Sequence, residues 1–121
     1  MHKVLMFGDR NYQHRSAIRR ELRKLIRKHG TKNLLIISGG APGADTMSRN
    51  EAWMQDIHCA EVKALWETRH RSAGPQRNGV MLALDPDEGI GFHEDIENSR
   101  GTKDMYNKLL AAKIPVRIVK R

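Results

Sequence analysis

The stretch over residues 34–45 constrains the fold more than any other, because an apolar run passes directly into a glycine-rich turn. Its sequence is LLIISGGAPGAD. A run of branched apolar residues is typical of a strand buried on both faces, as in a parallel sheet with helices on each side. Gly39, Gly40 and Gly43 let the backbone approach a ligand closely, and Pro42 suits the first turn of a helix. The stretch therefore predicts a strand, a turn and a helix start.

A turn of this kind is one way in which proteins bind phosphate. The free N–H groups and the positive dipole end at a helix start attract anions. The glycine spacing matches neither the dinucleotide fingerprint GxGxxG nor the P-loop GxxxxGK[ST]. By itself the stretch indicates either an anion site or a plain strand-to-helix turn.

The other hydrophobic patterns alternate between strands and helices. They predict strands over residues 3–7, 34–37, 59–64, 90–93 and 116–119, and helices over about 14–29, 43–55, 76–84 and 102–112. Under the right-handed crossover rule, this order predicts an α/β fold whose mainly parallel five-stranded sheet is covered by helices on both faces. At 121 residues, the chain is expected to form a single domain over residues 1–121.

Composition excludes several classes of protein. Hydrophobic residues make up 39% of the chain and charged residues 30%, and no apolar run approaches the roughly 18 residues that span a bilayer. The N-terminus lacks a signal-peptide pattern, so we expect a cytoplasmic protein without a membrane partner. Cys59 is the single cysteine, which excludes an internal disulfide framework. The six histidines show no His-x-x-x-His spacing, and we expect no metal and no cofactor.

The net charge of +8 raises the question of a nucleic-acid partner. Much of the positive charge lies on one segment, residues 15–28. Because the chain has neither zinc-finger spacing nor a ribonucleoprotein aromatic motif, a solvated helix face is favoured over nucleic-acid binding. Attraction of small anionic ligands is a further alternative.

Polar and glycine residues gather in the connections that leave the predicted strands. Ligands of parallel α/β sheets bind beyond the carboxyl ends of the strands. The connections at that edge are residues 8–11, 38–45, 66–78 and 93–102, and they are rich in glycines, hydroxyls, arginines and amides. The connections at the opposite edge, such as residues 30–33 and 85–88, are common turns. The sequence therefore places the candidate site at the carboxyl edge.

Several motifs in chain order resemble those of a known family. They are GDR at residues 8–10, SGGAPGAD at 38–45, AGPQRN at 73–78 with Met81, SRGT at 99–102 with Met105, and IPV at 114–116. Together they resemble the small YspA-like branch of the SLOG superfamily, found in bacteria and phages. That superfamily is Rossmann-like and includes the LOG phosphoribohydrolases and the DNA-processing protein DprA. The resemblance implies a Rossmann-like domain that binds a nucleotide or nucleotide-derived ligand as a sensor or sequestering module.

The resemblance and the rim chemistry together select candidate ligand-binding residues. Arg10 and Arg77 suit phosphate oxygens through their planar forks, Asp45 suits a ribose hydroxyl, Asn78 a base or sugar, and Trp66 a stacked base. Each also has a structural explanation, such as a surface ion pair, a helix cap or a core position. The full predicted set is Gly8, Arg10, Ser38, Gly39, Gly40, Gly43, Asp45, Trp66, Arg77, Asn78, Ser99, Gly101 and Thr102.

Catalysis is the less favoured expectation. LOG enzymes carry a PGGxGTxxE motif with a catalytic glutamate, and Met105 stands at that position here. An oxocarbenium-like transition state is stabilised by a nearby carboxylate. Asp45, Glu94 and Asp9 are weak candidates for this carboxylate, so the catalytic residues stay unknown. His70 and His93 lie on the same rim, but an acid–base role for them is not favoured.

Two alternatives therefore stay open beside ligand binding. A nucleotide N-glycoside hydrolase is the enzymatic alternative, and DNA binding is the alternative that the kinship with DprA suggests. A homo-oligomer is expected because so small a domain has a modest core and its relatives commonly pair. The sequence does not indicate which surface would be used for self-association.

Overall fold

The computed structural model describes residues 1–64 and 72–121. Strands and helices alternate along this part of the chain, as the sequence predicts. The strands are β1 (His2–Gly8), β2 (Leu34–Ser38), β3 (His58–Glu61), β4 (Glu88–Phe92) and β5 (Val116–Val119). The helices are α1 (Arg15–His29), α2 (Ala44–Met54), α4 (Ala73–Ala83) and α5 (Gly101–Ala111), and a short 3-10 turn, η2, spans Ile96–Asn98.

Two of the predicted boundaries differ from the structure by three residues, and the others agree to within two. Strand β3 ends at Glu61, three residues before the predicted end at position 64. Helix α4 begins at Ala73, before the predicted start at position 76. Its first turn contains Pro75, which a helix tolerates there because the first N–H groups have no partner within the helix.

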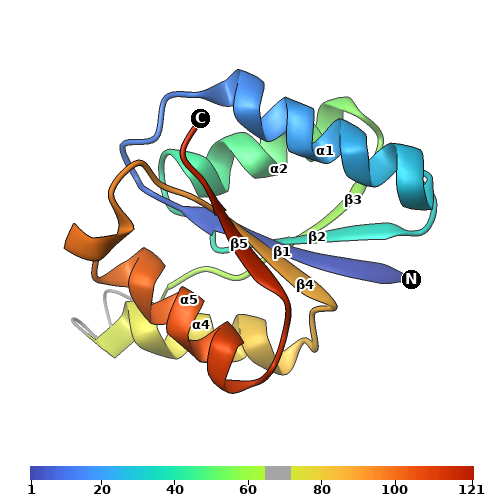
Figure 1. The fold of residues 1–121 in the computed structure, drawn as a ribbon. Helices are drawn as coiled ribbons and strands as arrows, with labels where there is room; N and C mark the ends of the chain where they lie inside the picture. Colours follow the sequence, from blue (N-terminus) through green and yellow to red (C-terminus); the bar gives the residue numbers. More distant parts are fainter. Residues whose placement is uncertain (65–71) are drawn as a thin grey trace.

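All five strands are parallel, in the order β3-β2-β1-β4-β5. Strand β1 lies at the centre, with β2 on one side and β4 on the other (Figure 1). The chain builds outward in one direction through β2 and β3, and in the other direction through β4 and β5. The carboxyl ends of β1 and β4 therefore form the topological switch point, where ligands of such sheets bind.

In the part of the chain that the structure describes, two helices cover each face of the sheet, which confirms the predicted α/β fold. Figure 1 shows α1 and α2 on one face and α4 and α5 on the other. Alternate residues of β1 enter the two cores: Val4 and Met6 pack toward α1 and α2, and Leu5 and Phe7 pack toward α4 and α5. This two-residue alternation follows from the pleat of a strand. Within the described ranges, no helix is both long enough and apolar enough to cross a membrane.

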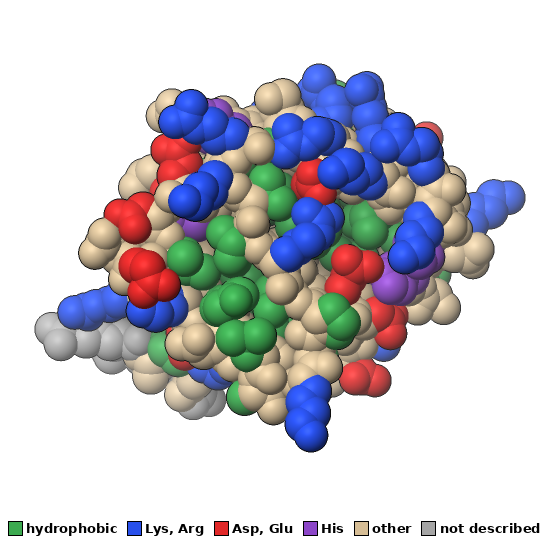
Figure 2. Space-filling view, in the orientation of Figure 1, with side chains coloured by type: hydrophobic (Ala, Val, Ile, Leu, Met, Phe, Trp, Pro, Cys, Tyr) green, Lys and Arg blue, Asp and Glu red, His purple; other side chains and the backbone are tan. Residues whose placement is uncertain are grey.

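The basic helix α1 uses part of its charge inside the fold. Glu51 of α2 is fully buried, and the Arg19 guanidinium donates two hydrogen bonds to its carboxylate at 2.9 and 3.1 Å. Glu21 is also buried and forms ion pairs with Arg20, Lys24 and Arg117. Lys and Arg side chains gather over α1 in Figure 2. The expectation of a simply solvated basic face is therefore incomplete, because several of these cations neutralise buried glutamates.

Candidate ligand-binding site

A cavity of about 1030 Å³ lies at the carboxyl edge of the sheet. Its wall is formed by the connections that follow β1, β2, β3 and β4 and by the first turns of α4 and α5. Most of the predicted site residues line it: Gly8, Arg10, Gly39, Gly40, Asp45, Arg77, Asn78, Ser99, Gly101 and Thr102. The structure thus brings together residues from motifs that are more than ninety positions apart in the sequence.

The glycine corner after β2 allows two charged side chains to reach the backbone. A β-carbon added to Gly39 would lie 2.8 Å from the Asp45 carboxylate and 3.0 Å from the Arg77 guanidinium. Any larger residue at position 39 would push one of these groups away. Glycine is therefore needed here for close approach.

Asp45 and Arg77 form a buried charged pair at the cavity wall. Arg77 Nη1 donates a hydrogen bond to the Gly39 carbonyl at 3.1 Å and lies 3.8 Å from Asp45 Oδ2. The same carboxylate oxygen accepts a bond from the Ala41 N–H at 3.2 Å. Asp45 Oδ1 and Arg77 Nε are buried and have no hydrogen-bond partner among the described residues. Buried polar atoms of this kind are usually satisfied by a ligand or a water.

Burial raises the pKa of Asp45 from its ordinary value of 3.8 to about 6. The Arg77 charge and the Ala41 N–H oppose this effect, since both stabilise the carboxylate, while Glu61 adds to it. A carboxyl group with a pKa near neutrality in a cavity is a common feature of functional sites.

Further cations face the cavity without a partner. Arg10, Lys63 and Arg100 line its wall, and in the part of the chain that the structure describes none of them forms an ion pair or hydrogen bond through its side chain. Of the acidic residues at the wall, Asp104 is paired with Lys108 at 2.6 Å and Asp45 lies 3.8 Å from Arg77, so Asp9 is the one carboxylate left to oppose these three cations among the described residues. The wall therefore offers an unneutralised positive charge to an anionic ligand.

The start of α5 is capped by its own sequence. Ser99 Oγ accepts a hydrogen bond from the Thr102 N–H at 3.1 Å. The Ser99 hydroxyl therefore acts as a helix cap, which is one of the two roles that the sequence allows. Asn78 Nδ2 donates to Asp104 Oδ2 at 2.9 Å and to the Gly101 carbonyl at 3.3 Å. These bonds fix α4 against α5 at the cavity wall.

Some predicted site residues do not reach the cavity. Ser38 is fully buried, and its hydroxyl donates to the Asp45 carbonyl at 2.9 Å, so it positions the first turn of α2 instead of contacting a ligand. Gly43 packs against the backbone of Asp9 and Arg10, and we remove both Ser38 and Gly43 from the candidate contacts. Trp66 and His70 lie outside the described residues.

Glu94, a weak catalytic candidate, also lies away from the cavity. Its carboxylate contacts His14 at 2.6 Å and Arg121 at 3.1 Å. The hydrogen bond with His14 lowers the pKa of Glu94, and the nearby Arg121 adds to that effect. Asp45 and Asp9 both line the cavity, whereas Glu94 does not. Asp45 is the better candidate acid of the two because it is the more deeply buried.

Sequence reasoning missed Lys63 and Arg100 as candidate contacts. Both follow a strand end, Lys63 after β3 and Arg100 after β4. The position of Arg100 in a predicted connection at the carboxyl edge was the available signal, whereas Lys63 was placed inside the predicted strand 59–64. Single lysines and arginines are common in loops, and only the folded chain shows that these two face the same space as Arg10.

The family model described as "YspA, cpYpsA-related SLOG family" matches residues 2–70. The chain belongs to this family. The match covers β1, the glycine corner and β3, and it confirms the family that the motifs indicate. One protein similar to this chain is the Gene 61 protein of Mycobacterium phage D29, and the two are 27% identical over 125 residues. That alignment covers 96% of this chain and 94% of the phage protein.

Two solved structures of DNA processing protein A share the fold of this SLOG-family chain. The Helicobacter pylori protein, whose single-stranded DNA binding mode has been described, has a TM-score of 0.72 with coverage of 99% of this chain and 66% of that one. The Streptococcus pneumoniae protein has a TM-score of 0.73 with coverage of 100% and 51%. The chain thus spans about two thirds of the length of the Helicobacter pylori protein and about half of the length of the Streptococcus pneumoniae protein. At 15% identity, the likeness shows the fold alone.

Proposed function

We propose that the cavity at the carboxyl edge binds a nucleotide or nucleotide-derived ligand, so that the protein acts as a sensor or sequestering module. The observation that carries this proposal is a set of three cations around one cavity at the switch point of the sheet, Arg10, Lys63 and Arg100, whose side chains have no partner among the described residues. Its volume, about 1030 Å³, is at the upper end of the range for small-molecule pockets. Membership of the SLOG family supports the same proposal.

The polar groups divide into a phosphate side and a sugar side. Arg10, Lys63 and Arg100 supply positive charge for phosphate oxygens, and the planar guanidinium groups suit paired hydrogen bonds. Asp45 would repel a phosphate, so its carboxyl group, whose Oδ1 has no hydrogen-bond partner within the described ranges, better fits a ribose hydroxyl. Arg77 Nε supplies a buried donor beside it.

Replacing Arg10 or Arg100 with alanine is expected to weaken nucleotide binding about 10-fold or more, because each removes a charge-assisted contact with phosphate. The measurement is isothermal titration calorimetry against mono- and dinucleotides, cyclic nucleotides, ADP-ribose and matched nucleosides. Phosphate-bearing ligands should bind and nucleosides should bind much less.

The matched control for these two variants is Arg23→Ala. Arg23 is an exposed arginine of α1, away from the cavity, with no ion pair or hydrogen bond among the described residues, and its replacement should leave affinity unchanged. Equal affinity of all three variants for every ligand would remove the phosphate side of the proposal.

Hydrolysis of an N-glycosidic bond is a second candidate, favoured by the position and the raised pKa of Asp45. An acid with a pKa near neutrality can donate or accept a proton during departure of a base. The test is chromatographic detection of free base released from nucleoside monophosphates. Release that Asp45→Asn abolishes supports hydrolysis, and absence of release from nucleotides that bind assigns the site to binding alone.

DNA binding can be separated from both candidates in the same preparation. If single-stranded DNA binds through α1, its affinity should fall steeply with salt and should drop in a variant carrying Arg23→Glu and Arg27→Glu. These exposed arginines suit the test better than Arg20, which contacts buried Glu21. DNA affinity that persists in this variant would exclude α1 as the DNA-binding surface.

A further inference from the structure

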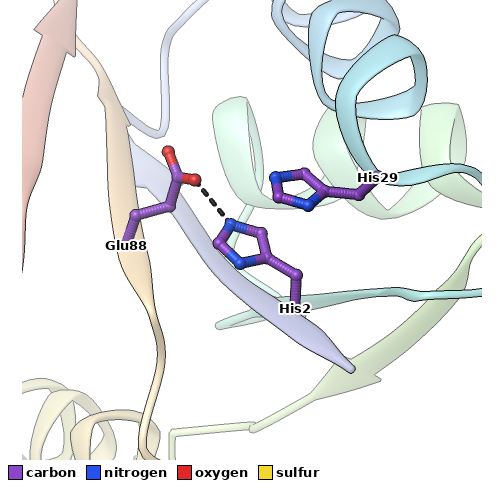
Figure 3. A group of neighbouring side chains, drawn as sticks. All are labelled: His2, His29 and Glu88. Carbon is purple, nitrogen blue, oxygen red and sulfur yellow. Dashed lines mark hydrogen bonds and ion pairs between the residues drawn. The ribbon is translucent and has the colours of Figure 1, made fainter.

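Three side chains with metal-binding atoms meet at the edge of the sheet opposite the cavity (Figure 3). His2 is the first residue of β1, Glu88 is the first residue of β4, and His29 is the last residue of α1. One ligand atom from each lies within 4.8 Å of the others. We propose that His2, His29 and Glu88 bind a divalent transition-metal ion, with Zn²⁺ the best fit to two imidazoles and one carboxylate.

An unsatisfied donor atom supports the proposal independently. His29 Nε2 is buried and has no hydrogen-bond partner among the described residues. Buried ring nitrogens normally have a partner, because leaving one without a hydrogen bond costs free energy. A metal ion held by the neighbouring His2 and Glu88 would satisfy this nitrogen.

The surroundings of His2 also fit a metal ligand. Its Nε2 lies 2.6 Å from Glu88 Oε2, and its Nδ1 lies 3.7 Å from Asp87 Oδ2. Asp87 is held in place by a hydrogen bond from the Lys3 N–H at 2.8 Å. Metal-binding histidines commonly direct their second nitrogen toward a carboxylate, which orients the ring. Asp87 is positioned to orient His2 in this way.

Metal binding requires a local rearrangement of the rings. The imidazoles of His2 and His29 are stacked, with centroids 3.9 Å apart and planes 13° apart. Lone pairs of parallel rings do not point at one ion, and donors in a tetrahedral zinc site lie about 3.4 Å from one another. Rotation of a partly exposed ring about its Cβ–Cγ bond supplies the required change. Loading therefore replaces the stack and the His2–Glu88 bond with three bonds to the metal.

The site would clamp three elements of the core. It would join the first residues of β1 and β4 to the end of α1, so a bound ion should stabilise the folded state. Strand β1 runs roughly 20 Å between this edge and the cavity. Metal binding should therefore leave nucleotide affinity unchanged, and the two proposals can fail separately.

The test is titration of the protein with Zn²⁺ at pH 7.5. Calorimetry should show one saturable site, and zinc at 100-fold excess over its Kd should raise Tm by at least about 5 °C. Co²⁺ should give the visible absorption of a four-coordinate ion. Zinc affinity should fall at least 10-fold in His29→Gln and in Glu88→Gln, both checked for folding by circular dichroism.

His58→Gln is the matched control, because His58 is also the first residue of a strand and is exposed outside the cluster. Its zinc affinity should equal that of the unchanged protein. The absence of a saturable site would overturn the proposal. Undiminished zinc affinity in His29→Gln would do the same, since it would show that His29 does not bind the ion.

Discussion

Replacing Gly8 with alanine is expected to lower the free energy of unfolding by about 3 kcal/mol or more. A β-carbon at this position would lie 2.2 Å from the Phe92 carbonyl oxygen, 2.9 Å from the Phe92 nitrogen and 2.8 Å from the Ala44 β-carbon. The first two atoms belong to the backbone of the paired strand β4, so no side-chain rotation removes the clash. Strand β1, strand β4 and the first turn of α2 would have to separate at the cavity wall.

Urea unfolding followed by far-ultraviolet circular dichroism measures this effect, and Gly79→Ala provides the matched control. Gly79 lies inside α4, and an added β-carbon meets nothing within 4 Å. Because alanine is the better helix former, this variant should gain about 0.5–1 kcal/mol. Gly8→Ala and Gly79→Ala should thus change stability in opposite directions. Similar small effects in both variants would contradict the close packing of Gly8 against β4.

Replacing Asp45 with asparagine is expected to stabilise the protein at pH 7.5 by on the order of 2–3 kcal/mol. The pKa of this carboxyl is about 6 in the folded protein, against an ordinary value of 3.8, because burial disfavours the charged form. The folded state therefore holds the proton more tightly than the unfolded state does. Asparagine occupies the same space without having to ionise.

The sign of the effect fixes its pH dependence. With a raised folded pKa, the stabilising contribution of the protonated carboxyl is complete below about pH 4 and is lost as pH rises toward and through 6. The unchanged protein should lose stability across this window relative to Asp45→Asn. The difference between the two proteins should be near zero at pH 4 and constant above about pH 7.

Urea titrations between pH 4 and pH 8 measure this difference, with Asp85→Asn as the control. Asp85 is exposed, so Asp85→Asn and the unchanged protein should have nearly the same free energy of unfolding at every pH. A destabilised Asp45→Asn at pH 7.5 would show that the contact with Arg77 outweighs the cost of burying the charge. If the variant is more stable and loses nucleotide affinity, the native carboxylate is retained for binding at the expense of stability.

Much of the fold could be predicted because its signals are local. The apolar run over residues 34–37 predicts a buried strand, and the structure confirms it as β2. The carboxyl edge of the sheet could also be predicted, because the direction of a parallel strand determines where its following loop lies. Boundaries were less accurate where a proline stood in a first helical turn, as in α4.

The candidate site was only partly predictable, because its members are assigned by contacts and not by residue type. The hydroxyl of Ser38 looked like a ligand contact in the sequence, yet it bonds to the Asp45 backbone. Lys63 fell within a predicted strand and Arg100 looked like an ordinary loop residue, yet both line the cavity. The sequence likewise could not show which cations of α1 are solvated and which pair with buried carboxylates, because the buried partner of Arg19 is Glu51 of a different helix.

The sequence by itself determined the α/β class, the alternation of strands and helices, the family and the edge of the sheet where a ligand would bind. These follow from hydrophobic periodicity and short motifs, which act over a few residues. Only the tertiary structure decided which charges are neutralised and which polar atoms lie unpartnered at the cavity. Nor does any spacing in the chain reveal that His2, His29 and Glu88 meet, because strand pairing and helix packing, which act between distant residues, bring them together.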